Sequence, residues 1–404
     1  MNHKKMFNQS ILDLIGRENE MFERDIKTTG NEINTIVESS RFLVLGGAGT
    51  IGQAVTKEIF KRQPVKLHVV DISENNLVEL VRDLRSSYGY INGDFKTFAL
   101  DIGSIEYDAF ITSDGNYDYV LNLSALKHVR SEEDPFTLMR MIDVNIFNTQ
   151  KTIQQSIENK VKKYFCVSTD KATNPVNMMG ASKRIMELFL MQKNKDITIS
   201  TARFANVAFS DGSLLYGFEQ RIKKQQPIAA PNDISRYFIT PKESGELCLM
   251  SCLLGENNTI FFPQLKNDLH LKSFADIARK YIENLGFEPY LCTTEEEARQ
   301  LAKTLPQTGQ WPYLLTKSDT TGEKETEVFF TKNEQLDLER FSTIGIIKNK
   351  LEFDGSDKLK EFSKSINDLK AKKSWTKEDL ITLFNKLLPN FNHNEAGKYL
   401  DHKM

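Results

Sequence analysis

The chain has 404 residues, and 40% of them are hydrophobic, which is enough for a large core and favours two domains over one. Its 53 lysines and arginines nearly balance its 55 aspartates and glutamates, which argues against a dedicated nucleic-acid binder. No apolar run approaches the roughly 20 residues of a membrane span, and the polar N-terminus does not resemble a signal peptide. These features predict a soluble, cytoplasmic protein.

The cysteines offer no metal-binding or disulfide pattern. Cys166 lies in an apolar, strand-like run, and Cys248 and Cys252 are at i and i+4 of an expected helix, without a CxxC motif or a nearby histidine. Together with Cys292, they are interpreted as reduced, buried thiols, so no metal site is expected.

Strands and helices are expected to alternate over the first half of the chain. Residues 1–40 have apolar residues at roughly helical spacing and are expected to form a helical lead. Such alternation indicates a Rossmann-like, doubly wound parallel sheet with helices on both faces. Strands are expected at the start of 41–52 and over 65–73, 95–102, 117–125, 161–172 and 197–207. Helices are expected from within 41–52 to about residue 62 and over 75–88, about 135–158 and 180–192.

The segment "GGAGTIG" follows the first strand and contains Gly46, Gly49 and Gly52 in the spacing G-x-x-G-x-x-G. Glycines let a backbone approach a pyrophosphate closely, and the N-terminus of the next helix supplies N–H donors and a positive potential. In this context the motif predicts a dinucleotide site, to which Thr50 and Ile51 of the same turn also belong.

Asp71 ends the next expected strand, about 20 residues after the glycine loop. A carboxylate at this place accepts hydrogen bonds from the adenosine ribose and repels a 2′-phosphate. The residues that follow, Ser73 among them, include no arginine to receive such a phosphate, so NAD is favoured over NADP. A helix N-cap or turn role is the alternative for Asp71.

Two further strand ends are expected beside the cofactor. Asp101 and Ile102 end the third strand, where Asp101 can meet the adenine amino group or serve as a simple turn aspartate. Ala125 ends the fourth strand. Because the carboxyl ends of parallel strands meet at one edge of the sheet, these residues are assigned to the same cofactor site.

Polar residues end the fifth strand in "CVSTDKATNP" (166–175), where Ser168 and the three residues after it are all polar. Chemistry in a doubly wound sheet takes place outside the carboxyl ends of the strands. Thr169 can bond a substrate hydroxyl, Asp170 can act as a general acid and Lys171 as a general base. The alternative is an Asp–Lys turn with both charges in water.

The next helix carries Lys183 in "NPVNMMGASK" (174–183). Short-chain dehydrogenase-type enzymes have a tyrosine four residues before such a lysine, whereas this chain has Met179, whose thioether cannot take a proton from an alcohol. At this spacing Lys183 is expected to bind the nicotinamide ribose and to add a positive field. A solvated helix lysine is the alternative.

Several segments together resemble one enzyme family: "GGAGTIG", "VVDISENNLVEL", "ALKHV", "STDKATNPVNMMGASK", "ARFANVAFSDGS" and "DISRYFIT", and more distantly "LIGRENE" and "TGEKETE". The chain resembles the nucleotide-sugar 4,6-dehydratases of the extended short-chain dehydrogenase/reductase superfamily, over about residues 10–335. Within them it looks like the branch that acts on UDP-N-acetylglucosamine. Several members of this family carry methionine in place of the tyrosine, so Met179 is interpreted as a subfamily mark.

The resemblance implies that UDP-N-acetylglucosamine, or a close nucleotide-hexosamine, is dehydrated to a 4-keto-6-deoxy sugar for bacterial surface-polysaccharide or nonulosonic-acid biosynthesis. A hydride would pass from carbon 4 to NAD and return to carbon 6. Lys171 would remove the carbon-5 proton, and Asp170 would protonate the hydroxyl that leaves carbon 6. Asp170, or a water relay through Thr169, would take the carbon-4 hydroxyl proton while Lys183 stabilises the alkoxide.

Substrate contacts are expected around the uridine diphosphate and the sugar, partly because guanidinium groups pair well with phosphate. For Arg221, in a basic helix, a solvated face is the alternative, and for His128 it is a structural role. Asn145 is expected to bond backbone near the active site. The candidates for substrate binding are Lys127, His128, Asn206, Ser213, Arg221 and Arg236.

Other functions stay open: a dehydratase that also inverts carbon 5, a UDP-sugar 4-epimerase, or a non-catalytic NAD(H)-sensing regulator. "AAPNDISRYF" and "NDLHLKSFADIARKYI" depart from the family pattern, which puts the sugar contacts in doubt more than the chemistry. A homo-oligomer is expected by analogy alone. The expected segments are a helical lead (1–40), an NAD-binding Rossmann domain (41–207), a UDP-sugar domain that can be interleaved with it (208–350) and a helical C-terminal extension (351–404).

Overall fold

A nine-stranded sheet forms the centre of the molecule. The computed structural model describes residues 11–204, 206–264, 271–319, 321–322, 327–349 and 355–399. The strand order is β15-β16-β11-β6-β5-β4-β1-β2-β3. All neighbouring pairs from β3 to β11 are parallel. The pairs β11–β16 and β16–β15 are antiparallel. The strands are β1 (Arg41–Leu45), β2 (Lys66–Asp71), β3 (Asp94–Ala99), β4 (Tyr119–Asn122), β5 (Lys163–Val167), β6 (Thr198–Ala202), β11 (Thr259–Pro263), β15 (Gln335–Asp337) and β16 (Ile344–Lys348).

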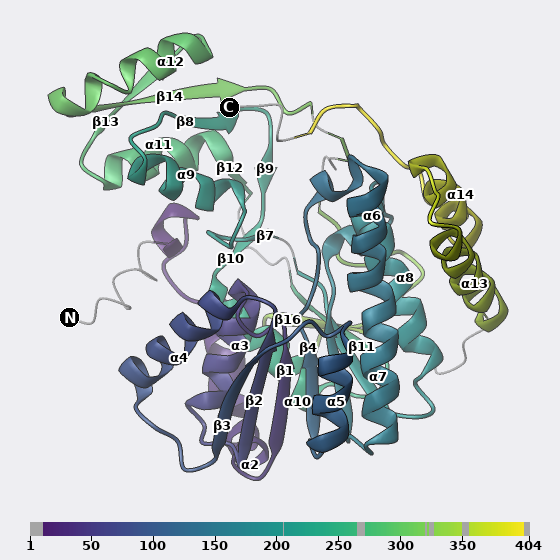
Figure 1. The fold of residues 1–404 in the computed structure, drawn as a ribbon. Coiled ribbons are helices and arrows are strands. Elements are labelled where there is room, and N and C mark those ends of the chain that lie inside the picture. Colours follow the sequence, from purple (N-terminus) through teal and green to yellow (C-terminus); the bar gives the residue numbers. More distant parts are fainter. Residues whose placement is uncertain are drawn as a thin grey trace.

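Helices cover both faces of this sheet (Figure 1), so the predicted Rossmann-like, doubly wound α/β fold is confirmed. On one face lie α2 (Glu23–Glu38), α3 (Thr50–Phe60), α4 (Glu74–Tyr88) and α10 (Pro241–Leu254). On the other lie α5 (Ile105–Ser113), α7 (Asn148–Glu158) and α8 (Met178–Gln192).

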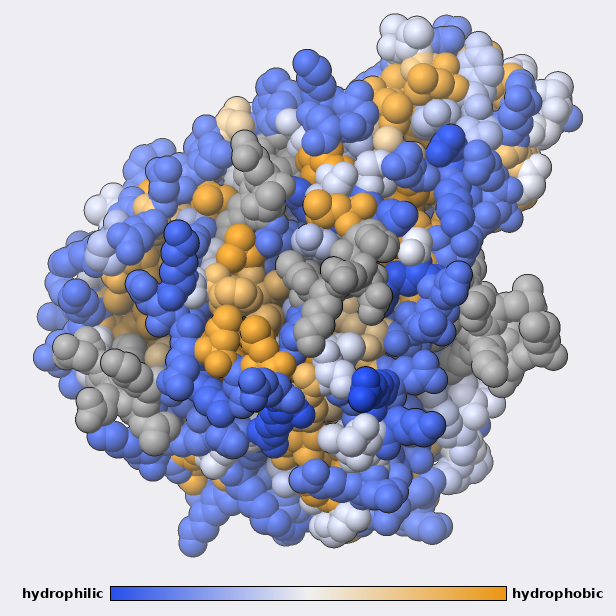
Figure 2. All heavy atoms as spheres, turned by 180° about the vertical axis from the view of Figure 1, so that it is seen from behind, coloured by the Kyte–Doolittle hydropathy of each residue, from blue (hydrophilic) through white to orange (hydrophobic). Residues whose placement is uncertain are grey.

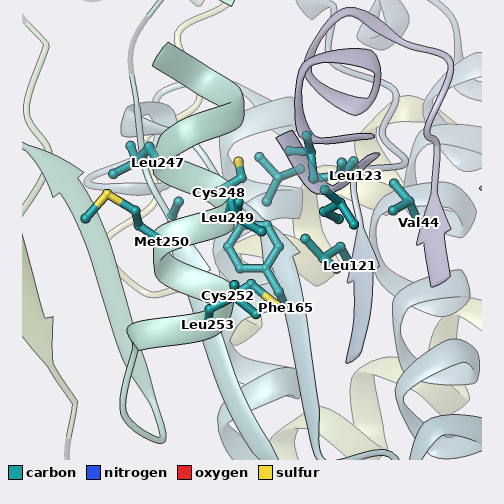
Figure 3. Packing of buried hydrophobic residues seen from close by; sticks show 14 of the residues in the cluster. Val44, Leu121, Leu123, Phe165, Leu247, Cys248, Leu249, Met250, Cys252 and Leu253 are labelled. Atoms are coloured by element: carbon teal, nitrogen blue, oxygen red, sulfur yellow. The ribbon is translucent and has the colours of Figure 1, made fainter. Parts of the chain in front are cut away.

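The strands are apolar on both sides because each side packs against a helical layer. Along β1, Phe42 and Val44 belong to one buried cluster, and Leu43 and Leu45 belong to the cluster of the opposite face. Figure 3 shows the first cluster, in which α10 lies over the strands. This two-sided burial explains why the strands could be identified as nearly continuous apolar runs.

The long helix expected over about 135–158 is present with a local widening. It consists of α6 (Pro135–Ile142), a π-helical turn (Asp143–Phe147) and α7. Asp134 caps its start, since its side chain accepts hydrogen bonds from the backbone of Phe136 and Thr137. π-helical turns inside α-helices are often found at functional sites, and this one contains Asn145.

A smaller unit lies above the carboxyl ends of the large sheet (Figure 1). After residue 207 the chain alternates between this unit and the large sheet, to which β11, β15 and β16 belong. The predicted division into an NAD-binding domain (41–207) and a UDP-sugar domain (208–350) therefore stays a proposal. The unit contains the sheet β13-β14-β8, with β8 (Ile228–Pro231), β13 (Glu288–Cys292) and β14 (Gln310–Thr316), and the helices α9 (Leu214–Lys223), α11 (Phe274–Asn284) and α12 (Glu295–Leu301). Two-stranded ladders join β7 (Asn206–Val207) to β10 (Phe238–Ile239) and β9 (Ser235–Arg236) to β12 (Lys272–Ser273).

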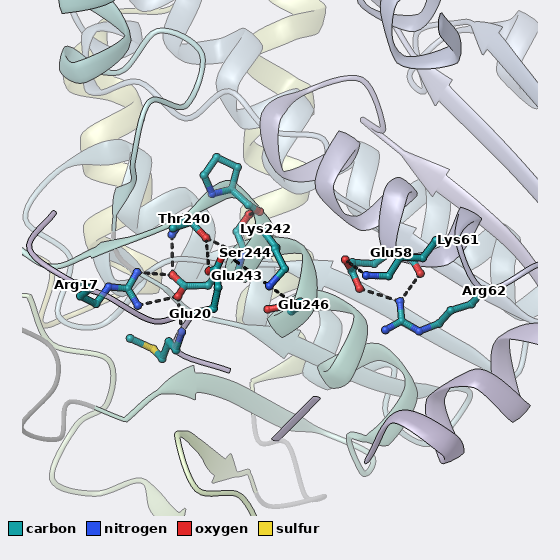
Figure 4. Close-up of polar contacts among 12 residues, drawn as sticks. Arg17, Glu20, Glu58, Lys61, Arg62, Thr240, Lys242, Glu243, Ser244 and Glu246 are labelled. Atoms are coloured by element: carbon teal, nitrogen blue, oxygen red, sulfur yellow. Dashed lines mark hydrogen bonds and ion pairs between the residues drawn. The ribbon is translucent and has the colours of Figure 1, made fainter. Parts of the chain in front are cut away.

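The N-terminal lead docks on α10 through buried charges (Figure 4). The guanidinium of Arg17 donates two hydrogen bonds, of 2.7 and 2.6 Å, to the carboxylate of Glu243. The same carboxylate accepts a hydrogen bond from the backbone of Thr240 and completes the capping box that starts α10. Arg17 of the lead and the start of α10 are thus held by one carboxylate.

The C-terminal extension packs beside α6 and α8 as two helices, α13 (Ser356–Lys372) and α14 (Lys377–Leu387). The indole N–H of Trp375 donates to the carbonyl of Pro135 at 2.9 Å. Figure 2 shows a mostly hydrophilic surface with apolar patches. Within the described part of the chain, none of the helices combines the length and the apolar character that crossing a bilayer requires.

Candidate active site

The glycine loop between β1 and α3 shows why each glycine is there. Gly46 has φ +70°, and a Cβ on it would lie 2.6 Å from the backbone nitrogen of Ser124. A Cβ on Gly52 would lie 2.1 Å from the carbonyl oxygen of Gly46. Gly49 is the N-cap of α3, and a Cβ on it would have its nearest neighbour at 3.7 Å. The protein itself needs the first and the last glycine, and the middle one leaves room for a phosphate at the helix N-terminus.

Asp71, at the end of β2, ties this loop to the next strand. Its carboxylate accepts 2.9 Å hydrogen bonds from the backbone of Ala48 and of Ser73. Asp71 thus makes the turn contact that was one alternative for it. The N-cap role belongs to Ser73, whose hydroxyl accepts from the backbone of Asn76 at the start of α4. A carboxylate has about four acceptor positions, so Asp71 keeps capacity for ribose hydroxyls. The glycine loop and the free acceptor positions of Asp71 fit an NAD adenosine.

Asp101 and Ile102 follow β3 at the same edge. The Asp101 carboxylate accepts a 2.8 Å hydrogen bond from the backbone of Gly103 and lies 3.9 Å from the guanidinium of Arg140. It therefore makes the turn contact that the sequence left open, and its proposed contact with adenine stays a prediction. Ile102 is buried and belongs to the cluster under the sheet edge.

Asn145 of the π-helical turn holds the segment after β4. Its side chain accepts a hydrogen bond from the backbone N–H of Leu126 and donates one to its carbonyl, each 3.0 Å long. It also donates to the hydroxyl of Ser182 on α8 at 2.9 Å. The expectation that Asn145 bonds backbone is confirmed, and this clamp joins the loop of Ala125 to the helix that carries Lys183.

The polar end of β5 is folded inward rather than into solvent. Asp170 is 1% exposed, and it accepts a 2.8 Å hydrogen bond from the hydroxyl of Thr169. The ammonium of Lys171 lies 3.5 Å from the same carboxylate, and its side chain is about one third exposed. The alternative of a fully solvated Asp–Lys turn is therefore wrong. A buried carboxylate and a partly exposed ammonium thus lie together at the carboxyl end of β5.

Lys183 and Met179 lie one helical turn apart on α8, and both are buried. The ammonium of Lys183 donates a 3.1 Å hydrogen bond to the carbonyl of Val167 at the end of β5. Burial lowers the pKa of Lys183, and the neighbouring Cys166 and Glu187 oppose this shift. Lys183 is thus not a solvated helix lysine. Met179 packs among apolar residues of α6, α8 and the C-terminal extension.

Three segments meet over the glycine loop. The backbone N–H of Asp211 donates a 2.9 Å hydrogen bond to the hydroxyl of Thr50. Burial lowers the pKa of Lys127, and the charge of Asp211 opposes this. A Cβ on Gly212 would lie 2.8 Å from the imidazole of His128. The segment leading to α9 therefore lies against the start of α3, and residues 127–128 lie beside that segment.

The remaining substrate candidates divide into two places. Ser213 caps α9, beside the contact just described, and accepts from the backbone of Tyr216 at 3.2 Å. Arg221 lies on the same helix in the smaller unit, where burial lowers its pKa and Glu295 of α12 opposes this. No contact described in the structure joins Arg221 to the Asp170 region, so its role in diphosphate binding stays a prediction.

Asn206 and Arg236 converge on Glu327, which the sequence analysis did not single out. The Asn206 amide and the Tyr237 backbone N–H, the latter at 2.9 Å, donate to the carboxylate of Glu327. The guanidinium of Arg236 lies 3.9 Å from it. Burial, and next the charge of Asp170, raise the pKa of Glu327 to about 7, although Tyr237, Lys171 and Arg236 oppose this.

The only sequence signal for Glu327 was its position as the last residue of "TGEKETE" (321–327), of which residues 323–326 lie outside the described part of the chain. Residues 1–10, 351–354 and 400–404 of the predicted terminal segments lie outside it as well.

Comparisons with known proteins bear on the family and the fold of the chain. A family model described as polysaccharide biosynthesis protein matches residues 42–349. An uncharacterized membrane protein of Methanocaldococcus jannaschii is 31% identical over 269 residues, which make up 64% of this chain and 76% of that protein. A UDP-N-acetylglucosamine 4,6-dehydratase (inverting) of Campylobacter jejuni is 29% identical over 55% of this chain and 66% of its own length. A UDP-glucose 4-epimerase of Rickettsia massiliae is 29% identical over 54% of this chain and 64% of its own length.

Other relatives are longer than the matched region. The match spans 46% of the capsular polysaccharide biosynthesis protein CapD of Staphylococcus aureus. The X-ray structure of Pen from Bacillus thuringiensis superposes with a TM-score of 0.64 at 25% identity, over 78% of this chain and 90% of that one. The resemblance read from the sequence is confirmed at the level of the family and the fold.

Proposed function

The chain belongs to the family of polysaccharide biosynthesis proteins, and we propose that it is an NAD-dependent dehydratase of UDP-N-acetylglucosamine or a close nucleotide-hexosamine. The observation that carries the proposal is the buried Asp170 beside the partly exposed Lys171 at the carboxyl end of β5. An acid and a base this close together suit an elimination, in which a proton and a hydroxyl leave neighbouring carbons.

The cofactor would be held by the backbone around Gly49 and by the carboxylate of Asp71. NAD, when bound there, supplies the acceptor and the donor of a hydride. Lys171 removes the proton on carbon 5 of the sugar, and Asp170 protonates the hydroxyl that leaves carbon 6. Lys183, buried behind the end of β5, contributes positive potential where negative charge develops on the carbon-4 oxygen.

The chain handles the carbon-4 hydroxyl without a tyrosine. Met179 has no ionisable group and packs among apolar side chains. The hydrogen bond from Thr169 to Asp170 offers a route for the proton, because a hydroxyl both donates and accepts. This arrangement supports Asp170, directly or through Thr169, as the group that receives the carbon-4 hydroxyl proton.

The direct test is incubation of the purified chain with NAD and UDP-N-acetylglucosamine, without a reductant, followed by mass spectrometry and NMR. The proposal expects the loss of one water and, in heavy water, deuterium at carbon 5. Recovery of unchanged substrate from a chain that binds NAD would contradict it.

A UDP-sugar 4-epimerase is the second candidate, because an epimerase is as similar to this chain as the dehydratase relative is. Its expected product has the mass of the substrate and an inverted carbon 4. Met179 disfavours this reading, since the resembling epimerases rely on a tyrosine as base at that position. The same mass and NMR measurements separate the two reactions, and they also report whether carbon 5 is inverted.

A further inference from the structure

We infer that the end of the chain, residues 391–399, positions the candidate base Lys171. These residues follow α14 and are called the C-terminal strap; in Figure 1 they run from the helical hairpin toward the smaller unit. They lie outside residues 42–349, which the family model matches. The role of Lys171 as a base rests on the proposed function, whereas the contacts that carry the inference belong to the fold. Glu395 of the strap acts through other residues and is assigned as a positioning residue.

The strap is hydrogen-bonded to two residues of the segment before Glu327. The backbone N–H of Thr321 donates to the carbonyl of Lys398 at 2.8 Å. The backbone N–H of Gly322 donates to the carbonyl of Asn394 at 2.9 Å. The hydroxyl of Thr321 donates to the carboxylate of a glutamate in the strap, Glu395, at 2.7 Å, and it accepts a 3.1 Å hydrogen bond from the backbone of the next residue. Main-chain and side-chain groups therefore join the strap to this segment.

Glu395 also ties the strap to the helical hairpin. Its carboxylate accepts hydrogen bonds from the ammonium of Lys377, at the start of α14, and from the hydroxyl of Tyr399, the latter at 3.0 Å. Lys377 donates to the hydroxyl of Tyr399 as well, at 2.7 Å. One carboxylate thus holds together the hairpin, the end of the strap and Thr321.

Asn177 carries the connection from Gly322 to α8. Its amide nitrogen donates to the carbonyl of Gly322 at 2.8 Å. Its amide oxygen accepts from the backbone N–H of Gly180 at 2.7 Å, which makes Asn177 the N-cap of α8. The strap also reaches the preceding residue directly, because the backbone N–H of Asn394 donates to the carbonyl of Val176 at 2.9 Å. The strap therefore holds the start of α8 by two routes.

The start of α8 lies directly against Lys171. A Cβ on Gly180 would overlap the carbonyl oxygen of Lys171, so the helix packs on the backbone of that residue without a side chain between them. The backbone N–H of Thr173 donates to the carbonyl of Asp170 at 3.0 Å, which keeps the turn that carries Lys171 compact. A shift of the start of α8 therefore moves the backbone of Lys171, and a displacement of about 1 Å can cost about 100-fold in rate.

Apolar burial alone does not explain the path of the strap. The two helices before it already cover the apolar face of α6 and α8. Within the strap Phe391 and Tyr399 are buried, but residues 394–398 are exposed. Hydrogen bonds therefore fix this stretch, and its backbone bonds lead to residues 176 and 321–322. A passive helical extension, which is the alternative, would not need them.

The test is a double-mutant cycle of Thr321→Val and Glu395→Ala in the full chain with NAD and UDP-N-acetylglucosamine. Thr321→Val keeps the shape of the side chain and removes its hydroxyl, whereas Thr321→Ser keeps the hydroxyl and should rescue the activity. Lys386→Ala, which breaks an exposed ion pair with Glu361 inside the hairpin, is the control.

The expected result is a kcat lower by about tenfold in Thr321→Val and in Glu395→Ala, because the base is displaced. The KM of the sugar nucleotide and the Kd of NAD should stay unchanged. The double variant should lose no more than the larger single loss, since both changes break one connection. Thr321→Ser and Lys386→Ala should keep the wild-type kcat. An unchanged kcat in both strap variants, or an equal loss in Lys386→Ala, would overturn the inference.

Amide hydrogen exchange followed by mass spectrometry tests the connection without turnover. In Glu395→Ala, peptides that cover 391–399 and 176–182 should exchange about fivefold faster, which corresponds to one lost hydrogen bond. Peptides of α7 should exchange as in the wild-type chain. Unchanged exchange at 176–182 would overturn the inference. Absence of dehydration by the wild-type chain, with this coupling of exchange present, would instead contradict the proposed function and still support the strap.

Discussion

The cofactor side and the substrate side of the site are built in different ways. The cofactor side consists of short segments in which a strand, a turn and a helix follow each other, as from β1 through Gly52 into α3. The substrate side joins residues that are far apart, such as Asn206 and Glu327, which are separated by 121 positions. Backbone geometry therefore determines the first side, and packing between distant segments determines the second.

The largest effect is expected at the junction of the two sides, where Lys171 stands. Lys171→Ala should lower kcat by at least about 100-fold, because a general base typically contributes that much or more. Carbon-5 deuterium exchange from heavy water should disappear while NAD affinity stays unchanged. Lys358→Ala, at an exposed position of α13, is the control. Exchange that persists in Lys171→Ala would remove this residue as the base.

The next effect concerns the frame of the substrate side. Arg203→Leu should lower the free energy of unfolding by about 3–5 kcal/mol, because the buried charge of Glu187 would lose its buried cation and keep only the partly exposed Arg184 and the hydroxyl of Ser168. Arg184→Leu removes the partly exposed partner of the same carboxylate and should cost less than about 1 kcal/mol. Urea unfolding of both variants checks the difference. Equal losses of unfolding free energy in the two variants would mean that the buried Arg203–Glu187 pair does not stabilise the substrate side more than the partly exposed pair does.

The glycine loop offers a matched pair on the cofactor side. Gly52→Ala should destabilise the fold by about 3 kcal/mol, since its Cβ would overlap the carbonyl of Gly46. Gly49→Ala should change stability by less than about 0.5 kcal/mol, because its Cβ has room. Its NAD Kd should nevertheless rise about tenfold, since the methyl group takes space from the phosphate. Calorimetry and NAD titration check both; normal NAD binding by Gly49→Ala would place the phosphate elsewhere.

The smallest functional effect is expected at Met179. Met179→Ala should cost about 2–4 kcal/mol of stability through a core cavity, yet leave measurable turnover. Met139→Ala, a buried methionine of the same cluster on α6, should behave alike and serves as the control. Loss of all turnover in a folded Met179→Ala, with Met139→Ala active, would show that the thioether does more than fill space.

Much of the fold was open to prediction because its signals are local. A strand buried on both faces is a continuous apolar run, and the glycine spacing between β1 and α3 follows from a backbone turn of a few residues. The π-helical turn at Asn145 escaped prediction, since one widened turn leaves the helical spacing of apolar residues almost unchanged. Its hydrogen bonds to Leu126 depend on a loop 19 residues away.

The amino-acid order alone determined the first six strands of the large sheet, where their polar carboxyl ends lie and which chemical groups stand there, since these depend on neighbours along the chain. Only folding decided that Asp170 is buried and that Asn206 and Tyr237 donate hydrogen bonds to Glu327. The meeting of Asn206 with Glu327 depends on how distant segments pack, and no periodicity in the chain encodes that contact. A carboxyl group acquires its proton affinity from such surroundings, so its role could be read only after the segments had met.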